Sequence, residues 1–574
     1  MSTLWPVAHG RRQLNSLLGM FLIAAALLIV SLLRVVGAQS WPWTTYWRMG
    51  GHDLANTRNQ PLTGIGVSNV NQLRTKWVFT TAGSVSATPA VVNGIVYFPD
   101  WPAPGAGGYF YAVAADTGHL IWQHLISDWT GVPGDFARDD PAFDGGEVFL
   151  GDQGGQLATF STTSGLIGPG ARVIAVNALT SQVTWVTQVD PFPGAMITGS
   201  PVVYNGVVYV GISSNEETLA TNPAYPCCSF RGSVVALDEA SGLILWQTPS
   251  IPRNPGGYTG GAVWDSTPVV DRSRGSLYVG TGNNYTVPSD VTTCITAARE
   301  NNQSDSACNS IDNYAQDYFD SVLALDLQTG AIKWAQRVQG YDAYTFACQS
   351  QAPGVTWCPS PNGPDYDFGG AGPNFFTTTV NGISQDIVGA GQKSGIYWAF
   401  NADNGDLVWN TLVGPGSFLG GIEWGTAADG NQIYVPIANG LNQPYTLQPS
   451  GQAANGGSWA ALDAATGTIL WQTATPGNCQ SLFGTVGGCM ALGPATVGNG
   501  VVYAASMDAN PSDPTMFALN AATGEILWSF AAGSQVNAAP AIVGDSLYWG
   551  SGYRFGSSNN QLYAFTLPRM INDD

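Results

Sequence analysis

The chain has 574 residues and a formal net charge of −20, yet only 10% of its residues are charged. With 72 glycines, 35 prolines and 20 tryptophans, and with 44% hydrophobic residues, it has the composition of a turn-rich, aromatic-rich globular protein, which excludes a disordered chain. The composition also argues against a nucleic-acid partner, because neutralising phosphates needs a surplus of Lys and Arg, and the chain has 19 basic against 39 acidic residues.

The first 40 residues differ in kind from the rest. Arg11 and Arg12 precede the apolar run 17–33, and the small residues Val36 and Ala38 follow at positions typical of signal cleavage. This pattern predicts an export signal over residues 1–40, or an uncleaved N-terminal anchor, because the run is at the lower limit for spanning a bilayer. Residues 41–574 are therefore expected outside the cytoplasm: periplasmic, secreted, or membrane-anchored.

The eight cysteines fall into four pairs of near neighbours in the sequence: Cys227/Cys228, Cys294/Cys308, Cys348/Cys358 and Cys479/Cys489. Disulfides persist in exported proteins, so we expect local pairing, although the sequence does not fix the connectivity. Adjacent residues have Cα atoms about 3.8 Å apart, below the usual disulfide range of about 4.4–6.8 Å. A bond between Cys227 and Cys228 therefore needs a reason, and two cysteines that are reduced or bonded elsewhere are the alternative.

A phrase that opens with Ala and closes with Trp ten positions later occurs seven times. The copies are 112–122, 175–185, 236–246, 324–334, 399–409, 461–471 and 518–528. Upstream of each lies a β-branched run with a central turn, such as SPVVYNGVVYVG at 200–211, which is typical of a β-hairpin. One unit is therefore predicted to be a sheet of four strands, the last of which ends in Trp.

Such a sheet has two faces to bury, and stacking copies around an axis buries both. An eighth copy is split between NQLYAFTLP at 560–568 and RTKWVF at 74–79, so the two chain ends would close one blade together. The sequence predicts an all-β, eight-bladed β-propeller over residues 41–574. Its eight tryptophans are expected to pack between blades with their indole N–H groups bonded to backbone; they are Trp77, Trp122, Trp185, Trp246, Trp334, Trp409, Trp471 and Trp528.

The phrase A-x-D-x-x-T-G-x-x-x-W resembles the tryptophan-docking motif of pyrroloquinoline quinone (PQQ) dehydrogenases over nearly the whole chain after residue 70. CCSFRGSVVALD, GPDYDFG (363–369) and GGIEWG (420–425) resemble the polyvinyl-alcohol dehydrogenase branch. The resemblance implies an alcohol substrate, secondary or polymeric, with PQQ and Ca²⁺ as cofactors. An external electron acceptor such as a cytochrome c is expected, since the chain contains no CxxCH haem-attachment motif. An outer-membrane assembly scaffold shares the repeat without a cofactor, so a non-catalytic binding or assembly propeller is the alternative.

The family's metal and catalytic residues map onto positions where one unit departs from the others. In GGAVWDSTP…GTGN, Trp264 is similar to the cofactor-stacking Trp and Asn283 to a calcium ligand; Glu216 in VYVGISSNEE is similar to a second ligand, with Glu217 behind it. Asp320, directly before Ser321 and its strand, corresponds to the catalytic aspartate and third metal ligand, although Asp317 also qualifies. The alternatives without function are that Trp264 is a core residue, that Asn283 is a turn residue and that the carboxylates are solvated.

Three further positions are implied to contact the quinone. Lys393 in GQKSGIYWAF resembles a lysine that reaches the quinone oxygens, unless it is a solvated turn residue. Arg138 lies one residue from the family's carboxylate-binding Arg, and Asp139 or Asp140 could pair with it instead. The wider family presses a vicinal disulfide against the quinone opposite a Trp, a role that the resemblance offers to Cys227 and Cys228.

Overall fold

The computed structural model describes residues 46–568 except 104, 252–256, 265–266, 309, 311–315, 351–352, 369, 481–485 and 554–558. The export signal or anchor expected over residues 1–40 lies outside the described residues and stays a prediction. Within the described ranges, no helix is long and apolar enough to cross a membrane.

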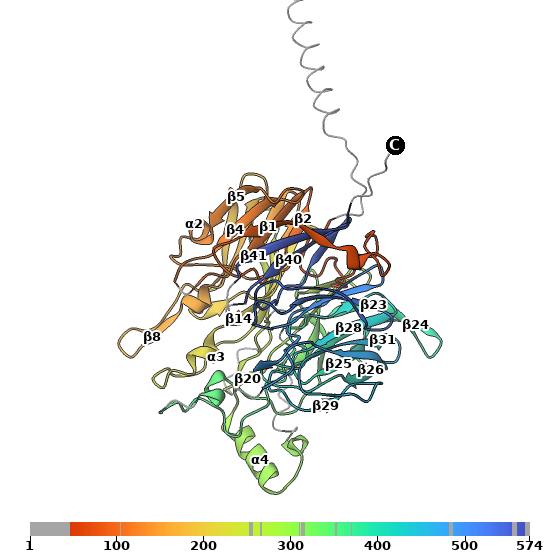
Figure 1. The fold of residues 1–574 in the computed structure, drawn as a ribbon. Helices are drawn as coiled ribbons and strands as arrows, with labels where there is room; N and C mark the ends of the chain where they lie inside the picture. The colour runs from red at the N-terminus through yellow and green to blue at the C-terminus, as the bar shows by residue number, and fades with distance from the viewer. Residues whose placement is uncertain are drawn as a thin grey trace, which may run out of the picture. The chain divides into compact units, whose positions relative to one another are not determined.

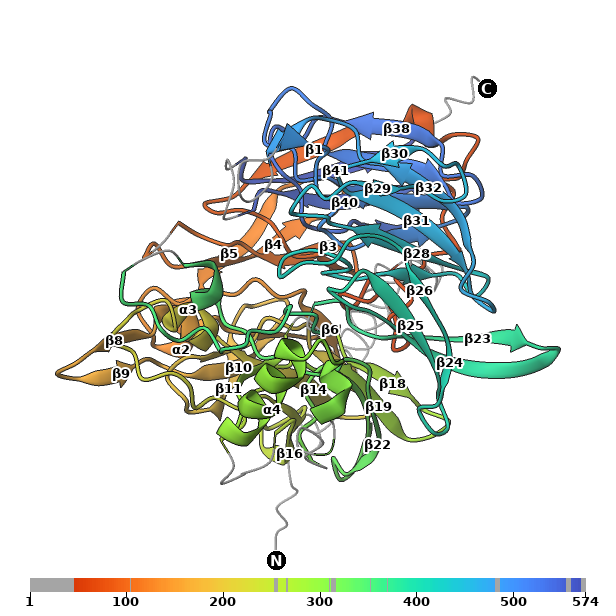
Figure 2. The same cartoon turned by 90° about the horizontal axis from the view of Figure 1, so that it is seen from below.

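Eight antiparallel sheets follow one another along the chain and form the blades of a β-propeller (Figures 1 and 2). Blade 1 contains β2 (Ala90–Val92), β3 (Ile95–Pro99), β4 (Tyr109–Ala114) and β5 (Leu120–Leu125), and blade 2 contains β6 (Ala142–Asp144), β7 (Glu147–Gly151), β10 (Ala171–Asn177) and β11 (Val183–Asp190). Blade 3 contains β13 (Val202–Tyr204), β14 (Val207–Ser214), β15 (Ser233–Asp238) and β16 (Ile244–Pro249), with β12 (Ala195–Met196) added to β14. Blade 4 contains β18 (Val269–Asp271), β19 (Ser276–Gly280), β21 (Ser321–Asp326) and β22 (Ile332–Arg337).

The second half of the ring repeats this order. Blade 5 contains β23 (Asn374–Val380), β24 (Ile383–Gly391), β25 (Ile396–Asn401) and β26 (Leu407–Leu412), and blade 6 contains β27 (Ala427–Ala428), β28 (Gln432–Ile437), β31 (Ser458–Asp463) and β32 (Ile469–Ala474). Blade 7 contains β35 (Thr496–Gly498), β36 (Val501–Ala505), β37 (Met516–Asn520) and β38 (Ile526–Phe530). Blade 8 contains β39 (Ala541–Val543), β40 (Ser546–Ser551), β41 (Gln561–Thr566) and β1 (Arg74–Thr80).

Short elements decorate the loops between these strands. The two-stranded pairs are β8 (Thr159–Ser161) with β9 (Gly165–Ile167), β17 (Thr259–Gly260) with β20 (Asn284–Thr286), β29 (Tyr445–Thr446) with β30 (Ala453–Ala454), and β33 (Cys479–Gln480) with β34 (Val486–Gly487). The helices are η1 (Val70–Gln72), α2 (Ile126–Thr130), η2 (Gly154–Leu157), α3 (Glu216–Leu219), α4 (Ser289–Glu300), η3 (Asp305–Cys308) and η4 (Phe346–Gln349).

The predicted blade shared by the two chain ends is confirmed. β1 pairs antiparallel with β41, and Trp77 lies opposite Ala564. The innermost strand β2 contacts both β6 and β39, so the first and last blades are neighbours. The ring is therefore closed by main-chain hydrogen bonds within one sheet.

The eight predicted tryptophans occupy equivalent positions. Each lies opposite an alanine of the neighbouring strand, as Trp185 lies opposite Ala175 and Trp528 opposite Ala518. Seven indole N–H groups donate to a carbonyl of the next blade, at 2.8–3.3 Å: Trp77 to Ala115, Trp122 to Ala178, Trp185 to Glu239, Trp246 to Leu327, Trp334 to Ala402, Trp409 to Ala464 and Trp471 to Ala521. Each hydrogen bond joins two blades, so the repeated phrase sets the spacing between sheets.

The glycine of the phrase is required by two constraints at once. Gly242 has φ +70°, and a Cβ at this position would lie 2.5 Å from Cδ2 of Trp185. Only glycine adopts the left-handed conformation without cost and leaves room for the indole. In the copy at 175–185 this position holds Ser181, which keeps the left-handed backbone with φ +59°.

A segment that the repeat pattern did not predict runs across the inner strands. Residues 46–64, the inner strap, exchange hydrogen bonds with seven of the eight blades. The partners are Val91, Phe143, Val270, Phe375, Ala428, Val497 and Gly544. Arg58 of the strap is 3% exposed, and its guanidinium lies 3.4 Å from Asp140 of the loop before β6. The strap thereby ties blades that are far apart in the sequence.

We expect Ser181→Gly to stabilise the propeller by about 0.5–1 kcal/mol, because relief of left-handed strain outweighs the extra chain entropy of glycine. The matched reverse variant, Gly242→Ser, should destabilise by about 1–3 kcal/mol through overlap with Trp185. Denaturant midpoints of the two variants and of the wild type measure both effects. Equal midpoints for all three proteins would contradict the role assigned to this position.

Candidate active site

The topology gathers every candidate residue at one end of the strands. Because neighbouring strands in a blade are antiparallel, the loop before the innermost strand and the loop between the second and third strands lie at the same end. Glu216, the Cys227–Cys228 pair and Lys393 follow second strands, and Asp320 precedes a third strand. Arg138 and Trp264 precede innermost strands, so residues from blades 2 to 5 share one face.

A buried group of carboxylates surrounds Lys393. The ammonium Nζ lies 3.2 Å from Asp365 Oδ1 and 3.3 Å from Asp367 Oδ2, and the Lys393 backbone N–H donates to the Asp367 carbonyl. Burial lowers the pKa of Lys393, but Asp365, Asp367, Glu423 and Glu217 together raise it well above its usual value. The acid cluster is the set Glu217, Asp320, Asp342, Asp365, Asp367 and Glu423, all at most 6% exposed.

Asp320 is the member of the acid cluster whose carboxylate is least satisfied. It is fully buried, and neither oxygen accepts a hydrogen bond from a donor group; the carboxylate lies against that of Asp342 instead. Its backbone is held at φ +42°, uncommon for a residue other than glycine, by an N–H bond to the Gly282 carbonyl at 3.1 Å. Burial, and next the negative charges of Asp342 and Asp367, raise its pKa well above the usual value. Asp317, the alternative, accepts a hydrogen bond from Asn284 at 3.2 Å.

Asn283 and Trp264 lie next to each other. The Asn283 amide nitrogen donates to the carbonyls of Asn284 and Tyr344, at 2.9 and 3.0 Å, so its side-chain oxygen points away from them and has no partner. A Cβ on Gly282 would lie 3.1 Å from Nε1 of Trp264, whose indole N–H is also unpartnered. A carbonyl oxygen and an aromatic ring therefore lie near each other, and their roles toward a metal and a cofactor stay predictions.

The two candidate glutamates on α3 have different environments. Glu216 accepts hydrogen bonds from the Tyr225 hydroxyl at 2.5 Å and from the backbone N–H groups of Ser229 and Phe230, both at 2.8 Å. Glu217 bonds none of these donors, and its Oε1 has no hydrogen-bond partner. Burial and the neighbouring acids raise its pKa to about 8, although the positive charge of Lys393 lowers it. The second choice, Glu217, thus faces the acid cluster, while Glu216 holds the loop 225–230.

That loop carries the vicinal disulfide. The four expected local disulfides, Cys227–Cys228 among them, are present. Glu216 fixes the loop on both sides of Cys227 and Cys228, through Tyr225 before the pair and Ser229 and Phe230 after it. Cys228 packs against the same buried cluster as Trp264, which brings the disulfide loop and the predicted aromatic floor to one hydrophobic core.

Arg138 is stacked between two indole rings. Its guanidinium carbon lies 4.3 Å from the Trp101 ring centroid and 4.7 Å from that of Trp424, within cation–π range. Of the two acids that could have neutralised it, Asp140 pairs with Arg58, and Asp139 accepts the Gly151 N–H at 2.7 Å. Arg138, Trp424 and Arg58 also line one small cavity of about 40 Å³ among the inner strands. Arg138 therefore keeps its donors for another acceptor.

The donor chemistry of these residues suits a hard cation. Buried oxygens without hydrogen-bond partners are presented by Asn283, Glu217 and Asp320, and oxygen donors of this kind are the ligands that Ca²⁺ prefers. The acid cluster sets six carboxylates against one ammonium, so a bound cation would offset charge that is otherwise costly to bury. For an anionic planar cofactor, the fitting groups are the unpaired guanidinium of Arg138 and the half-buried ring of Trp264.

Several members of the site were not assigned a role from the sequence. Asp365 and Asp367 lie in GPDYDFG, and Glu423 and Trp424 lie in GGIEWG, two motifs that indicated the family branch without a function. Asp342 carries no motif at all; its carboxylate accepts the backbone N–H groups of Asp365 and Tyr366 at 3.0 and 2.6 Å. A Cβ on Gly363 would lie 2.1 Å from Asp342 Oδ1, which explains the glycine that opens GPDYDFG.

Comparison with known proteins agrees with this geometry. The PQQ_2 family, described as "Outer membrane protein assembly factor BamB", matches residues 71–224, 166–336 and 455–567. The chain is 30% identical to a polyvinylalcohol dehydrogenase of a Pseudomonas species, over 90% of this chain and 74% of the relative, and 29% identical to that of Sphingopyxis sp. (strain 113P3), over 90% and 73%. The quinohemoprotein alcohol dehydrogenase ADHIIG of Pseudomonas putida HK5 shares the fold, with a TM-score of 0.65 and 18% identity over 91% of this chain and 80% of its own.

The ring of docking tryptophans and the family match define a propeller of the PQQ-type repeat class. Within that class, the high coverage of the first two relatives is decisive. The chain belongs to the polyvinylalcohol dehydrogenase family of oxidoreductases.

The acid cluster predicts an unusual pH dependence for the cofactor-free protein. The pKa of Asp342 is raised to about 6 and that of Glu217 to about 8, mainly by burial, whereas both groups in the unfolded chain release their protons near pH 4. The native state therefore holds more protons between these values, and its stability falls as pH rises from about 5 to about 8. Added Ca²⁺ should raise the melting temperature more at pH 8 than at pH 5. A Ca²⁺ shift equal at both pH values would contradict the assignment of ionised ligands.

The adjacent glutamates offer a matched pair of variants. Glu216→Gln should speed the reduction of Cys227–Cys228 by a mild thiol about tenfold, because charge-assisted hydrogen bonds that hold the loop are weakened. Glu217→Gln should leave that rate unchanged and weaken Ca²⁺ binding to the apo-protein. Thiol release and calorimetric titration measure the two effects. The same change in both variants would show that the two side chains do not have separate roles.

Proposed function

We propose that this protein is an exported quinoprotein dehydrogenase that oxidises alcohols, with PQQ held noncovalently and Ca²⁺ bound beside it. The observation that carries the proposal is the buried Asp320 carboxylate, which lies against the Asp342 carboxylate without a donor group to satisfy it, in an acid cluster with a single ammonium. Such an arrangement costs folding free energy, and a site of this kind in a dehydrogenase family is typical of acid–base chemistry at a bound substrate.

Asp320 would act as the general base. Its fully buried carboxylate accepts no hydrogen bond from a donor group, so it could take the proton of a substrate hydroxyl, and its raised pKa makes it a stronger proton acceptor than a solvated aspartate. The hydrogen bond from its backbone N–H to Gly282 fixes the main chain, so the carboxylate keeps its place. Exclusion of water around it strengthens its interaction with the hydroxyl.

The other residues would hold the cofactors. Glu217, Asn283 and Asp320 would supply oxygens to Ca²⁺, and Glu216 would keep Cys227 and Cys228 in place. Trp264 would support the quinone ring on the other side from the disulfide, while Arg138 and Lys393 would pair with its carboxylates and carbonyl oxygens. When bound, PQQ supplies a hydride acceptor for the carbinol carbon.

The substrate and acceptor belong to the same proposal. Two relatives that match 90% of this chain are named for polyvinyl alcohol, which supports a secondary, polymeric alcohol as the substrate. Export, with or without a membrane anchor at residues 1–40, would place the enzyme where a polymer is accessible. Electrons would then pass to an external acceptor such as a cytochrome c.

Reconstitution tests the proposal. Apo-protein with PQQ and Ca²⁺ should show a bound-quinone absorption spectrum and dye-coupled oxidation of an alcohol panel. Asp320→Asn should lower kcat by a factor of about 10²–10⁴, as expected for loss of a general base. Asp317→Asn, three residues away and equally buried, should stay within a few-fold of wild type. Oxidation of no alcohol by the reconstituted wild type, or full activity of Asp320→Asn, would overturn the proposal.

A further inference from the structure

A cavity of about 550 Å³ lies next to the acid cluster, under the insertion between β20 and β21. This cap pocket is lined by Arg299, Ser304, Asp305, Ser306, Gln339, Gly340, Tyr341, Asn362, Gly363, Pro364 and Tyr366. One wall is the insertion that carries α4 and η3, visible below the blades in Figure 1, and the opposite wall is the loop between β22 and β23.

The cap pocket and the acid cluster share two backbone segments. Tyr341 is followed by Asp342, and Pro364 and Tyr366 enclose Asp365, so the same two backbone segments line the pocket and supply the acid cluster. The Tyr366 N–H donates to Asp342 at 2.6 Å, which fixes the two segments to each other. The cap pocket therefore borders the segments that position the acid cluster.

The insertion is held rigidly against the blades. Arg299 bonds Asp305 at 3.0 and 2.7 Å and donates to the Asn362 carbonyl at 3.1 Å, thereby bridging the two walls. The disulfide Cys294–Cys308 joins α4 to η3, and Ile295 packs into a buried cluster with Tyr341. The pocket is thus preformed, and binding would cost little ordering of the protein.

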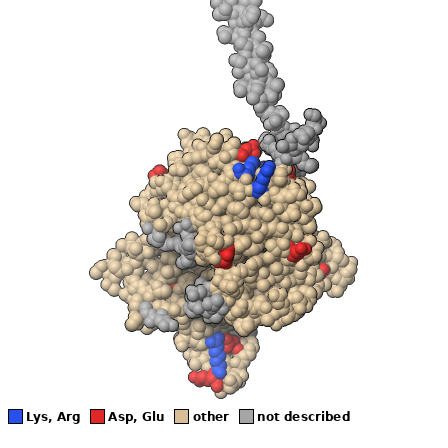
Figure 3. Space-filling view, viewed as in Figure 1, with Lys and Arg blue, Asp and Glu red and all other residues tan. Residues whose placement is uncertain are grey.

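The chemistry of the lining favours a neutral ligand with many hydroxyl groups. Ser, Asn, Gln and Tyr side chains offer both donors and acceptors, and the rings of Tyr341 and Tyr366 provide apolar surface for a carbon backbone. The charged pair Arg299–Asp305 is mutually neutralised. Figure 3 shows few charged side chains over most of this face, with blue and red atoms together at its lowest part, where Figure 1 shows α4.

We propose that the cap pocket is a binding subsite for the non-reacting part of a polyhydroxylated chain whose reacting hydroxyl lies at Asp320. This inference rests on the proposed function and deepens it. Interactions with remote parts of a substrate contribute binding free energy that a small alcohol cannot supply. The enzyme would then bind longer chains more tightly, up to the length that fills the pocket.

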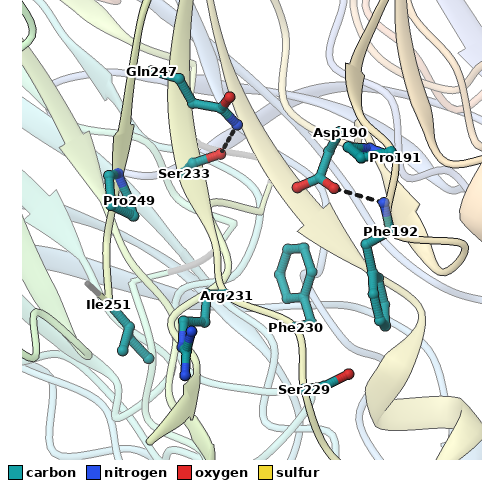
Figure 4. Close-up of a pocket in the computed structure, with 10 residues that line it drawn as sticks. All are labelled: Asp190, Pro191, Phe192, Ser229, Phe230, Arg231, Ser233, Gln247, Pro249 and Ile251. Atoms are coloured by element: carbon teal, nitrogen blue, oxygen red, sulfur yellow. Dashed lines mark hydrogen bonds between the residues drawn. The ribbon is translucent and has the colours of Figure 1, made fainter. Parts of the chain in front are cut away.

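A second cavity, of about 630 Å³, provides a contrast. It lies beside the disulfide loop between Asp190 and Ile251, and Figure 4 shows Phe192 and Phe230 along it. Phe230 is 2% exposed, and the Asp190 carboxylate is bonded to the Phe192 N–H at 2.8 Å. None of its lining residues adjoins Asp342 or Asp365 in the sequence, so the cap pocket is the better placed of the two.

Blocking variants test the subsite. Ser306→Trp fills the pocket from the insertion, and Asn362→Trp fills it from the opposite wall; both residues are exposed and outside the acid cluster. Ala297→Trp is the matched control, because Ala297 is exposed on α4 but does not line the pocket. Circular dichroism and melting temperature establish that each variant is folded. If Ser306→Trp does not fold, Asn362→Trp takes its place in the test.

Binding of vinyl-alcohol oligomers to the apo-protein is measured by calorimetry, and KM by dye-coupled oxidation over a series from 2-propanol to the polymer. We expect wild type and Ala297→Trp to bind the oligomers and to show KM falling with chain length. The blocking variants should lose about tenfold in oligomer affinity and keep KM for 2-propanol within about twofold.

Equal oligomer affinity in blocking and control variants, or KM independent of chain length in wild type, would overturn the subsite while leaving alcohol oxidation intact. Absence of oxidation for every alcohol, with oligomer binding still sensitive to Ser306→Trp, would instead overturn the proposed function and retain the pocket. The two failures are therefore distinguishable.

Discussion

The site depends on the burial of six carboxylates around one ammonium. Lys393 pairs directly with Asp365 and Asp367, and its positive charge reaches Glu217 as well. One lysine cannot neutralise six carboxylates, so the remaining negative charge must be offset by bound protons or by a cation. The raised pKa values of Asp342 and Glu217 indicate bound protons. The protein is therefore built with a site that is stable only when one of these two requirements is met. Cation binding and proton release are two sides of the same equilibrium.

Such a cluster needs a scaffold that does not yield to electrostatic repulsion. Its members come from the loops of four consecutive blades, so any splaying of the blades would let water enter and separate the charges. The indole hydrogen bonds fix each blade to the next, and the inner strap fixes blades that are not neighbours in sequence, for example through Val91 and Val497. Because β1 pairs with β41, the ring cannot open at the junction of its ends without breaking a sheet. The contacts of the repeats thus stabilise the fold against the repulsion within the acid cluster.

The repeat allowed the fold to be predicted nearly completely, because docking tryptophans and hairpin turns are local patterns with one stable arrangement. Candidate site residues could be proposed only where a unit departed from its siblings, as for Trp264, Asn283, Asp320 and Lys393, and their roles stay predictions. Asp342 was missed because nothing around it departs from an ordinary loop; its importance comes from the backbone N–H groups of a segment more than twenty residues away. The inner strap was missed for a related reason: its contacts are main-chain hydrogen bonds, which leave little trace in the side-chain sequence.

The adjacent glutamates show where sequence comparison stops and structure is needed. Both belong to one turn of α3, and either could align with a family ligand. In the structure, three donors from the disulfide loop saturate Glu216, whereas Glu217 is left with an oxygen that lacks a partner. Consecutive residues of one helical turn cannot move independently, so a cation that draws Glu217 towards Asn283 and Asp320 would also act on the loop that Glu216 holds. The position of Cys227 and Cys228 is therefore expected to follow occupancy of the cation site, although no atom of the disulfide is a metal ligand.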